Sequence, residues 1–233
     1  MCFGATLALL GALVFGIVGL LLALGWWPAL VGAVAGALLG RLLVQRAVGR
    51  IVAGIGAVPL GDAPRLENLV EGLCVANGIV RPRLVVVEAP AHNACAVGLN
   101  PRHSTLIVTR GLLDHLTRIE LEGVVARELA LVKSGHAALA TVVAVIASFS
   151  PALAQRLLPE RADVVADMAA VGLTRYPPGL LDALDKIRRD PGLDQVPRWT
   201  RHLWIEDPEG PASGRSGPFH SSIDERIATL REL

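Results

Sequence analysis

The sequence VVARELALVK, residues 124–133, forms the centre of the segment that decides the fold. Thr117 and Glu120 precede it with the spacing of a capping box, and Gly135 follows it as a residue that ends helices. We therefore expect one helix over about residues 118–133. Residues four apart on this helix share one face, so side chains with that spacing point into the same environment.

Turn-forming residues divide the sequence on either side of this helix into short elements. Two aliphatic runs predict strands, at residues 84–87 and 105–108. Helix-capping side chains and prolines near helix starts predict four more helices. The first begins at Pro64 behind an Asp62 cap and ends at Asn77. The second runs from Pro159 to about Val171, and the third runs from Pro177 to about Arg189. The fourth follows a second capping box of Ser222 and Glu225.

Two further stretches differ from the rest in composition. Residues 137–154 carry no charge, and we expect one buried or membrane-associated helix there. A full crossing would place residues 155–233 on the opposite side of the membrane from residues 51–136. We expect these two halves to meet in one domain, so we do not expect a span. Residues 207–218 are rich in Pro, Gly and Ser, so they predict a flexible loop.

The composition of the whole chain excludes some classes of function. It has 233 residues, of which 52% are hydrophobic, and a formal net charge of +1. Binding of nucleic acid requires a basic surface, so we expect no nucleic-acid partner. The cysteines Cys2, Cys74 and Cys95 lack CxxC spacing. They predict reduced, buried thiols rather than a disulfide framework or a cysteine zinc site.

The amino-terminal stretch predicts a transmembrane hairpin. Residues 1–40 contain no Asp, Glu, Lys, Arg or His, and they accommodate spans at about 5–24 and 28–44. Each span is near the ~20 residues that cross a bilayer. The Gly-Trp-Trp-Pro sequence at 25–28 predicts the turn between them. The second span carries a ridge of small residues for close helix packing, Gly32, Gly36 and Gly40.

Basic residues determine the predicted orientation and the domain boundary. Arg41, Arg46 and Arg50 flank the second span, so the positive-inside rule places both the start of the chain and everything after the hairpin in the cytoplasm. We therefore expect a multi-pass protein of the plasma (inner) membrane. Its hairpin occupies residues 1–50 and its cytoplasmic domain residues 51–233. A cleaved signal peptide does not fit, because a signal has a basic start and a shorter apolar core.

The helix at 118–133 resembles the zinc-binding helix of the HtpX-like peptidases, whose motif reads H-E-L-A-H. In that motif two histidines one turn apart hold zinc, and the glutamate beside the first activates a water molecule. Here Arg127 and Leu131 stand at the two histidine positions, while Glu128 keeps the position of the general base. The resemblance therefore implies a catalytic position at Glu128 that is vestigial without its metal.

Two upstream segments carry the same resemblance. NACAVG, residues 93–98, looks like the family's N-A-F-A-T-G, which forms an edge strand beside the substrate. VTRGLL, residues 108–113, is similar to the family's V-T-x-G-L-L. The resemblance thus implies four substrate-binding positions, Asn93, Ala94, Cys95 and Ala96.

Two downstream segments complete the resemblance, which covers most of residues 60–233. DVVAD, residues 163–167, resembles E-x-x-A-D, so Asp163 stands at the position of the third zinc ligand. HSSIDERI, residues 220–227, resembles the family's H-P-P-x-x-x-R-I tail. The resemblance implies structural roles for Asp167, His220 and Arg226. The family normally has two more hydrophobic spans before E-x-x-A-D, and this chain has room for at most one.

The altered motif predicts a chain without a cofactor. Zinc in such a fold needs three protein ligands, but arginine stays protonated and leucine has no donor atom. A zinc site rebuilt with His220 or His136 remains an alternative. We expect instead that Arg127 pairs with Asp163 where the metal would lie, with Glu128 as a second candidate partner, because an unpaired buried carboxylate is costly. Leu131 is expected to fill the remaining space.

The sequence as a whole predicts an α+β fold. A two-helix transmembrane hairpin precedes a mainly helical, metallopeptidase-like domain with a small β-sheet. The predicted function is that of an inactive pseudopeptidase, a binding or regulatory membrane protein in a family that the resemblance links to protein quality control. Its expected partners are the membrane and a protein or unfolded peptide segment that adds to the edge strand. Two alternatives stay open, an active zinc endopeptidase with non-standard ligands and a structural subunit of a larger membrane complex.

Overall fold

The computed structural model describes residues 26–158, 161–190, 192–193, 196–209 and 220–233, together with positions 11, 12, 16 and 18. The chain divides into two compact units, Met1–Arg50 and Ile51–Leu233. The first predicted span, at about residues 5–24, lies outside the described residues except for those four positions. The predicted loop at 207–218 also lies outside them beyond residue 209.

The described part of the first unit consists mainly of one long helix, α2 (Trp26–Gly54), which continues into the second unit. The turn predicted at 25–28 is wrong at its described positions, because Trp26, Trp27 and Pro28 form the first turn of α2. Proline is tolerated there, since the first N–H groups of a helix have no partner within the helix. Within the described residues, no single helix has both the length and the hydropathy of a membrane span. The bent pair at 118–134 and 136–147 meets that test only together.

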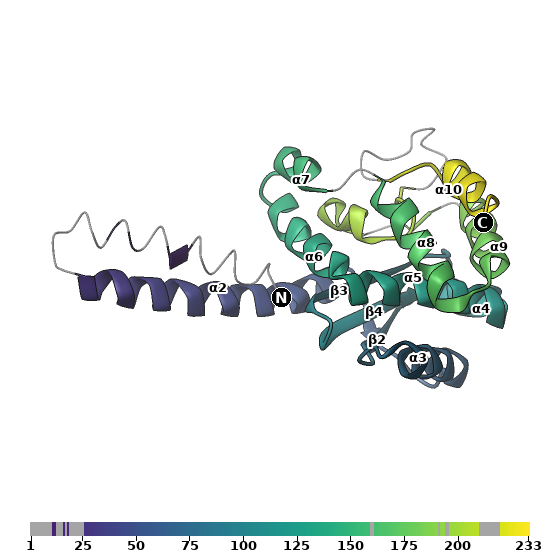
Figure 1. Ribbon diagram of the computed structural model, residues 1–233, viewed down its shortest axis with the longest axis horizontal. Helices are drawn as coiled ribbons and strands as arrows, with labels where there is room; N and C mark the ends of the chain where they lie inside the picture. The colour runs from purple at the N-terminus through teal and green to yellow at the C-terminus, as the bar shows by residue number, and fades with distance from the viewer. Residues whose placement is uncertain are drawn as a thin grey trace. The chain divides into compact units, whose positions relative to one another are not determined.

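A four-stranded mixed sheet forms one part of the second unit (Figure 1). Its order is β1 (Val58–Pro59), β2 (Arg83–Val87), β4 (His103–Thr109) and β3 (Ala94–Asn100). Strands β2 and β4 pair in parallel, and the other two pairs are antiparallel. Both predicted strands are confirmed, and the segment predicted as an edge strand is β3 at the sheet edge. The mainly helical chain with its small sheet confirms the α+β class.

Helices make up most of the second unit, and several predicted boundaries are confirmed. The capping box of Thr117 and Glu120 starts α5 (Arg118–Ser134), and Gly135 ends it with a φ of 82°. The remaining helices are α3 (Pro64–Asn77), α4 (Arg110–His115), α6 (His136–Ala147), α7 (Pro151–Leu157), α8 (Ala162–Thr174), α9 (Pro177–Arg188), the 3₁₀ helix η1 (Arg198–Leu203) and α10 (Ile223–Leu230), which the Ser222 hydroxyl caps.

Three helix predictions need correction. Ala63, not Asp62, is the N-cap of α3, and it makes no side-chain cap hydrogen bond. The single helix predicted over 137–154 is two helices, because Pro151 forces Ser150 into an extended conformation that interrupts the helix. The helix predicted from Pro159 begins instead at Ala162. Arg161 precedes it in the left-handed region with a φ of 58°, so the regular helix cannot extend further back.

Helix α5 lies at the centre of the second unit and contacts α3, α6, α8, α9 and β3 (Figure 1). Its inward residues belong to one large apolar core, which also receives side chains from α3, the sheet, α9 and α10. Cys74 and Cys95 are buried free thiols, as predicted, while Cys2 lies outside the described residues. Because α5 is surrounded on several sides, a polar side chain on it must find its partners inside the protein.

The glycine of the VTRGLL segment is required by a close backbone approach. The Gly111 N–H donates to the Ala89 carbonyl at 2.9 Å, and a Cβ atom on Gly111 would lie 1.8 Å from the Pro90 carbonyl oxygen. No side chain can relieve that overlap, because the opposing atom belongs to the backbone. The α4 start therefore tolerates only glycine at this position.

We predict that Gly111→Ala lowers the free energy of unfolding by about 1–3 kcal/mol, because the backbone near Pro90 must move. Gly72→Ala is the matched control, since it also lies in a helix but a Cβ there meets nothing within 4 Å. It should stabilise the protein by about 0.5–1 kcal/mol. Urea unfolding of the purified chain in detergent measures both values, and equal stability of the two variants would contradict the interpretation.

Candidate functional site

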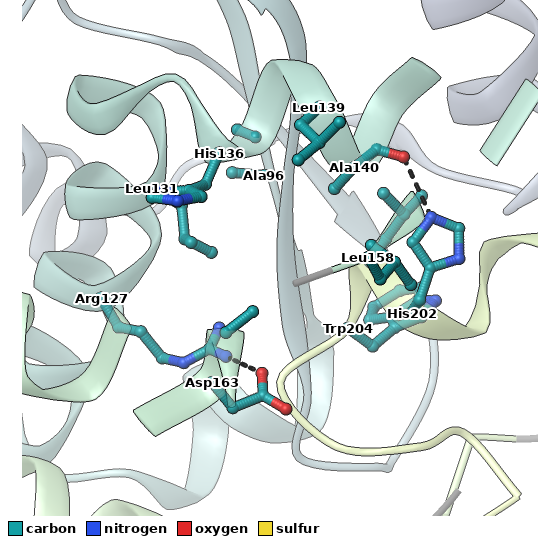
Figure 2. A pocket seen from close by; sticks show the side chains of 13 residues that line it. Ala96, Arg127, Leu131, His136, Leu139, Ala140, Leu158, Asp163, His202 and Trp204 are labelled. Atoms are coloured by element: carbon teal, nitrogen blue, oxygen red, sulfur yellow. Dashed lines mark hydrogen bonds and ion pairs between the residues drawn. The ribbon is translucent and has the colours of Figure 1, made fainter. Parts of the chain in front are cut away.

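A buried arginine forms the centre of the site. The Arg127 side chain is 2% exposed, and all three of its nitrogen atoms donate to carboxylates. Nη1 lies 2.6 Å from Glu128 Oε1, Nη2 lies 2.6 Å from Asp163 Oδ1, and Nε lies 2.9 Å from Asp167 Oδ1. Figure 2 shows Arg127 pointing at Asp163. The predicted contact with Asp163 is present, and Asp167 adds a partner that the sequence did not predict for Arg127.

A second buried arginine connects this cluster to the carboxy-terminal helix. Arg226, on α10, donates through Nε to Asp167 Oδ2 at 2.6 Å and through Nη2 to Asp167 Oδ1 at 3.0 Å. Its Nη1 donates to the Ile205 carbonyl at 2.7 Å. Asp167, on α8, therefore accepts from two guanidinium groups at once. The cluster holds α5, α8 and α10 together through charge-assisted hydrogen bonds.

His220 completes the cluster, and its hydrogen-bond partners determine its protonation state. Its Nδ1 lies 3.1 Å from Asp163 Oδ2, and its Nε2 lies 3.1 Å from the Arg201 carbonyl oxygen. Both neighbours are acceptors, so both ring nitrogens carry protons and the ring is an imidazolium. Burial alone would lower the pKa of His220, but the Asp163 carboxylate, with the Arg201 carbonyl and Glu206, outweighs burial and raises it. The predicted structural role of His220 thus has a physical basis.

Burial and charge act against each other on every member of the cluster. Burial favours neutral Arg127, but Glu128, Asp167 and Asp163 together raise its pKa above the ordinary value. Burial would raise the pKa of Asp163, but His220, Arg226 and Arg127 hold it well below its usual range. For Glu128 burial prevails and the pKa is raised. Its Oε2 has no hydrogen-bond partner among the described residues, so Glu128 is the least well stabilised carboxylate.

The residues at this position do not fit a zinc ion. The Arg127 guanidinium bridges Glu128 and Asp163, the two acidic groups at the family's zinc and general-base positions, and its charge would repel a divalent cation. His220 uses Nδ1 for Asp163, and His136 lies with its Nδ1 2.8 Å from Ser134 Oγ. No group of three or more His, Cys, Asp or Glu side chains in the described part of the chain is arranged to hold a metal ion.

A small pocket of about 50 Å³ adjoins the cluster. Its lining includes Arg127, Leu131, Asp163 and His136, with the apolar side chains of Ala96 and Leu158 (Figure 2). The expectation that Leu131 fills the remaining space is therefore wrong. Leu131 packs against Ala96 and its helical neighbours at the pocket wall instead. The pocket has room for one or two water molecules rather than a side chain.

The chain itself occupies the edge of β3, where the resemblance implies substrate binding. Cys95 forms an antiparallel bridge with Trp204, and the Ile205 N–H donates to the Ala94 carbonyl at 3.0 Å. The Asn93 side chain donates to the Glu206 carbonyl at 2.8 Å. Asn93, Ala94, Cys95 and Ala96 are all buried. An added peptide strand at this edge has to displace residues 204–206.

Sequence reasoning did not predict the groups that cover β3. Thr141, on α6, accepts from the Gly98 N–H through its hydroxyl at 2.9 Å, and Trp204 and Ile205 lie against Ala94 and Cys95. These residues belong to segments without a motif. The only available signal was the uncharged stretch at residues 137–154 around Thr141, which predicts burial but not a partner.

We predict that Arg127→Leu lowers the free energy of unfolding by about 3–5 kcal/mol, because it leaves Glu128, Asp163 and Asp167 short of a buried cation. The matched control is Arg110→Leu, which breaks an exposed pair with Glu88 and should cost at most about 1 kcal/mol. Urea unfolding in detergent compares the two. Similar losses in both variants would show that the buried cluster does not stabilise the fold.

The contribution of His220 should depend on pH in a defined direction. Its folded pKa is raised above the unfolded value of about 6.5, so its stabilisation is complete below that pH and is lost as pH rises through the folded pKa. We predict that the stability difference between the wild type and His220→Gln shrinks as the pH rises above about 6.5 and through the raised folded pKa. His103→Gln, at an exposed position, is the matched control. A difference that grows with pH would contradict the protonated state of His220.

Comparison with known proteins agrees with the motifs on these helices. Residues 61–184 match peptidase family M48. "Protease HtpX homolog" of Dictyoglomus turgidum is 34% identical over 213 residues, which cover 74% of this chain and 70% of that protein. The protein of the same name from Limosilactobacillus reuteri is 27% identical over 222 residues, which cover 74% of each chain. The chain therefore belongs to peptidase family M48, as an HtpX-like member.

Proposed function

We propose that this chain is a non-catalytic, membrane-anchored member of family M48, in which an ion-pair cluster replaces the metal centre. One observation carries the proposal. The Arg127 guanidinium donates to Glu128, Asp163 and Asp167 at 2.6–2.9 Å, in the place where the resemblance puts the metal. The carboxylates of the site thus pair with cationic side chains of the protein, Arg127 together with Arg226 and His220, in place of an exchangeable ion.

The same contacts remove the remaining elements of peptidase chemistry. A general base needs an accessible water molecule within hydrogen-bond reach. Glu128 is 0% exposed, and one of its oxygens is already bound to Arg127. Activation of that water also needs a Lewis acid with an open position, which Arg127 and Leu131 cannot provide. Hydrolysis of a peptide bond therefore has neither an activated nucleophile nor an electrophile at this site.

The retained scaffold suits a role in binding or regulation. In this proposal a protein partner contacts the domain without being cleaved. Strand addition at Ala94 and Cys95 requires that the Trp204–Ile205 segment leaves, because this segment holds the free edge of β3. A partner that binds the domain as folded therefore contacts another surface than this part of β3.

The anchorage part of the proposal rests on the first 40 residues, which contain no Asp, Glu, Lys, Arg or His. Within the first unit, Gly11 lies close to Gly36, since a Cβ on Gly11 would be 3.4 Å from the Gly36 carbonyl oxygen. Close approach at glycines is typical of helices that pack inside a bilayer. With Arg41, Arg46 and Arg50 on the cytoplasmic side, the domain faces the cytoplasm.

Zinc content tests the proposal directly. Purified wild-type chain should contain no stoichiometric zinc, and it should not cleave casein in a chelator-sensitive manner. Arg127→His/Leu131→His/Asp163→Glu restores the ligand set of the family, so this variant should bind one zinc ion per chain. Arg127→Gln/Leu131→Gln/Asp163→Glu is the matched control, which removes the same cation without supplying imidazoles, and it should stay free of zinc.

The wild-type measurement decides the proposal even if the altered chains fail to fold. Stoichiometric zinc in the wild type, together with cleavage that a chelator stops, would show a working peptidase with non-standard ligands. Zinc would then have to be held by groups other than those at the family positions. Co-purification of zinc without cleavage would also overturn the claim that Arg127 takes the place of the metal.

A further inference from the structure

The connection between α6 and α7 exposes large apolar side chains at the end of the domain. Phe149 is 86% exposed, and Leu153 and Leu157 are 49% and 42% exposed. The three residues are spaced four apart, and Leu153 and Leu157 lie on one face of α7. Ala154, between them, is fully buried. The helix thus turns its small residue toward the protein and its large apolar residues outward, opposite to the arrangement on a water-facing helix.

The side chains of Phe149, Leu153 and Leu157 lie at one end of the second unit. Figure 1 shows α7 at the end of the second unit that α6 reaches, away from α9 and α10. Helix α6 packs on β3 and η1, and its Val143 and Ala147 pack with Ala154 of α7 in one apolar cluster. The surface formed by Phe149, Leu153 and Leu157, which we call the α7 tip, therefore projects from a fixed support.

The charges around the α7 tip favour a lipid surface as the occupant. Residues 129–159 contain no Asp or Glu, and their only charged side chains are Lys133 and Arg156. Arg156 is exposed on α7 itself, between Leu153 and Leu157 in sequence. Apolar side chains with an exposed basic residue on the same short helix match the interface of a bilayer that contains anionic lipids.

The dimensions of the two helices allow insertion but not a crossing. Helix α6 has 12 residues and rises ~18 Å, and α7 has 7 residues and rises ~10 Å, against ~30 Å of hydrocarbon. The inner face of α6 is also buried in the domain. Of the described residues of α6 and α7, the α7 tip is therefore the part that we expect to enter the bilayer, with the segments on both sides of it on one side of the membrane.

We propose that the α7 tip inserts into the head-group region of an anionic bilayer and thereby holds the domain against the membrane surface. Phe149, Leu153 and Leu157 enter the boundary between head groups and acyl chains, and Arg156 contacts lipid phosphates. This second contact is additional to the amino-terminal anchor, and it does not depend on whether the site hydrolyses peptides.

A fluorophore beside these residues tests the contact in the full chain. An NBD group is attached at Ala152→Cys, which is exposed and leaves the three apolar residues intact. Cys2→Ser removes the cysteine that lies outside the described residues. The other two cysteines, Cys74 and Cys95, are buried. Val75→Cys is the matched control, because Val75 is 79% exposed on α3. The proteins are reconstituted into vesicles of phosphatidylglycerol and phosphatidylcholine that contain doxyl-labelled lipid.

The label at residue 152 should shift to the blue, lose most of its fluorescence to the doxyl lipid and resist iodide, while the label at residue 75 should do none of these. Phe149→Ser/Leu153→Ser should abolish the quenching at residue 152, and vesicles of phosphatidylcholine alone should reduce it.

A label at residue 152 as open to iodide as the one at residue 75 would overturn the proposal, whether or not the chain floats with vesicles. Flotation reports the amino-terminal anchor separately. Equal quenching in both lipid mixtures would refute the role of Arg156.

Discussion

The structure depends on one electrostatic constraint, the neutralisation of three buried carboxylates. Glu128, Asp163 and Asp167 lie together in the interior, where solvent does little to stabilise their charges. In a low-dielectric interior an ionised carboxylate without a cation is strongly unfavourable, and it either binds a proton or finds a partner. Arg127 supplies that partner with a planar set of donors that reaches all three groups at once.

The same constraint reaches beyond the site to the covered edge of the sheet. Asp167 accepts from both Arg127 and Arg226, and Arg226 donates onward to the Ile205 carbonyl. Ile205 in turn donates its N–H to Ala94 on β3. A continuous series of buried hydrogen bonds therefore joins Arg127 to the edge strand. The cluster thus also holds the segment that covers β3.

Local sequence signals explain how much of this arrangement was predictable. The capping box at Thr117 and the glycine at residue 135 determine α5, and the E-x-x-A-D likeness places Asp163 opposite Arg127. These predictions rest on contacts between neighbours in sequence or on a shared motif. The covering of β3 depends on Asn93 and Glu206, which are 113 residues apart and carry no pattern that would pair them. Pro151 marks the break between α6 and α7 in the sequence, whereas the apolar run around it predicts a single helix.

The persistence of three carboxylates explains why an arginine, and not an apolar residue, stands at position 127. A fully apolar replacement of a buried ion cluster is often as stable as the cluster, but it requires all the charged partners to change together. Any single change leaves a buried charge unpaired, at a cost of about 3–5 kcal/mol, which is a large part of the stability of a typical domain. A cation at position 127 donates to Glu128, Asp163 and Asp167 at once, while Asp167 also accepts from Arg226. The guanidinium therefore preserves the junction of α5, α8 and α10.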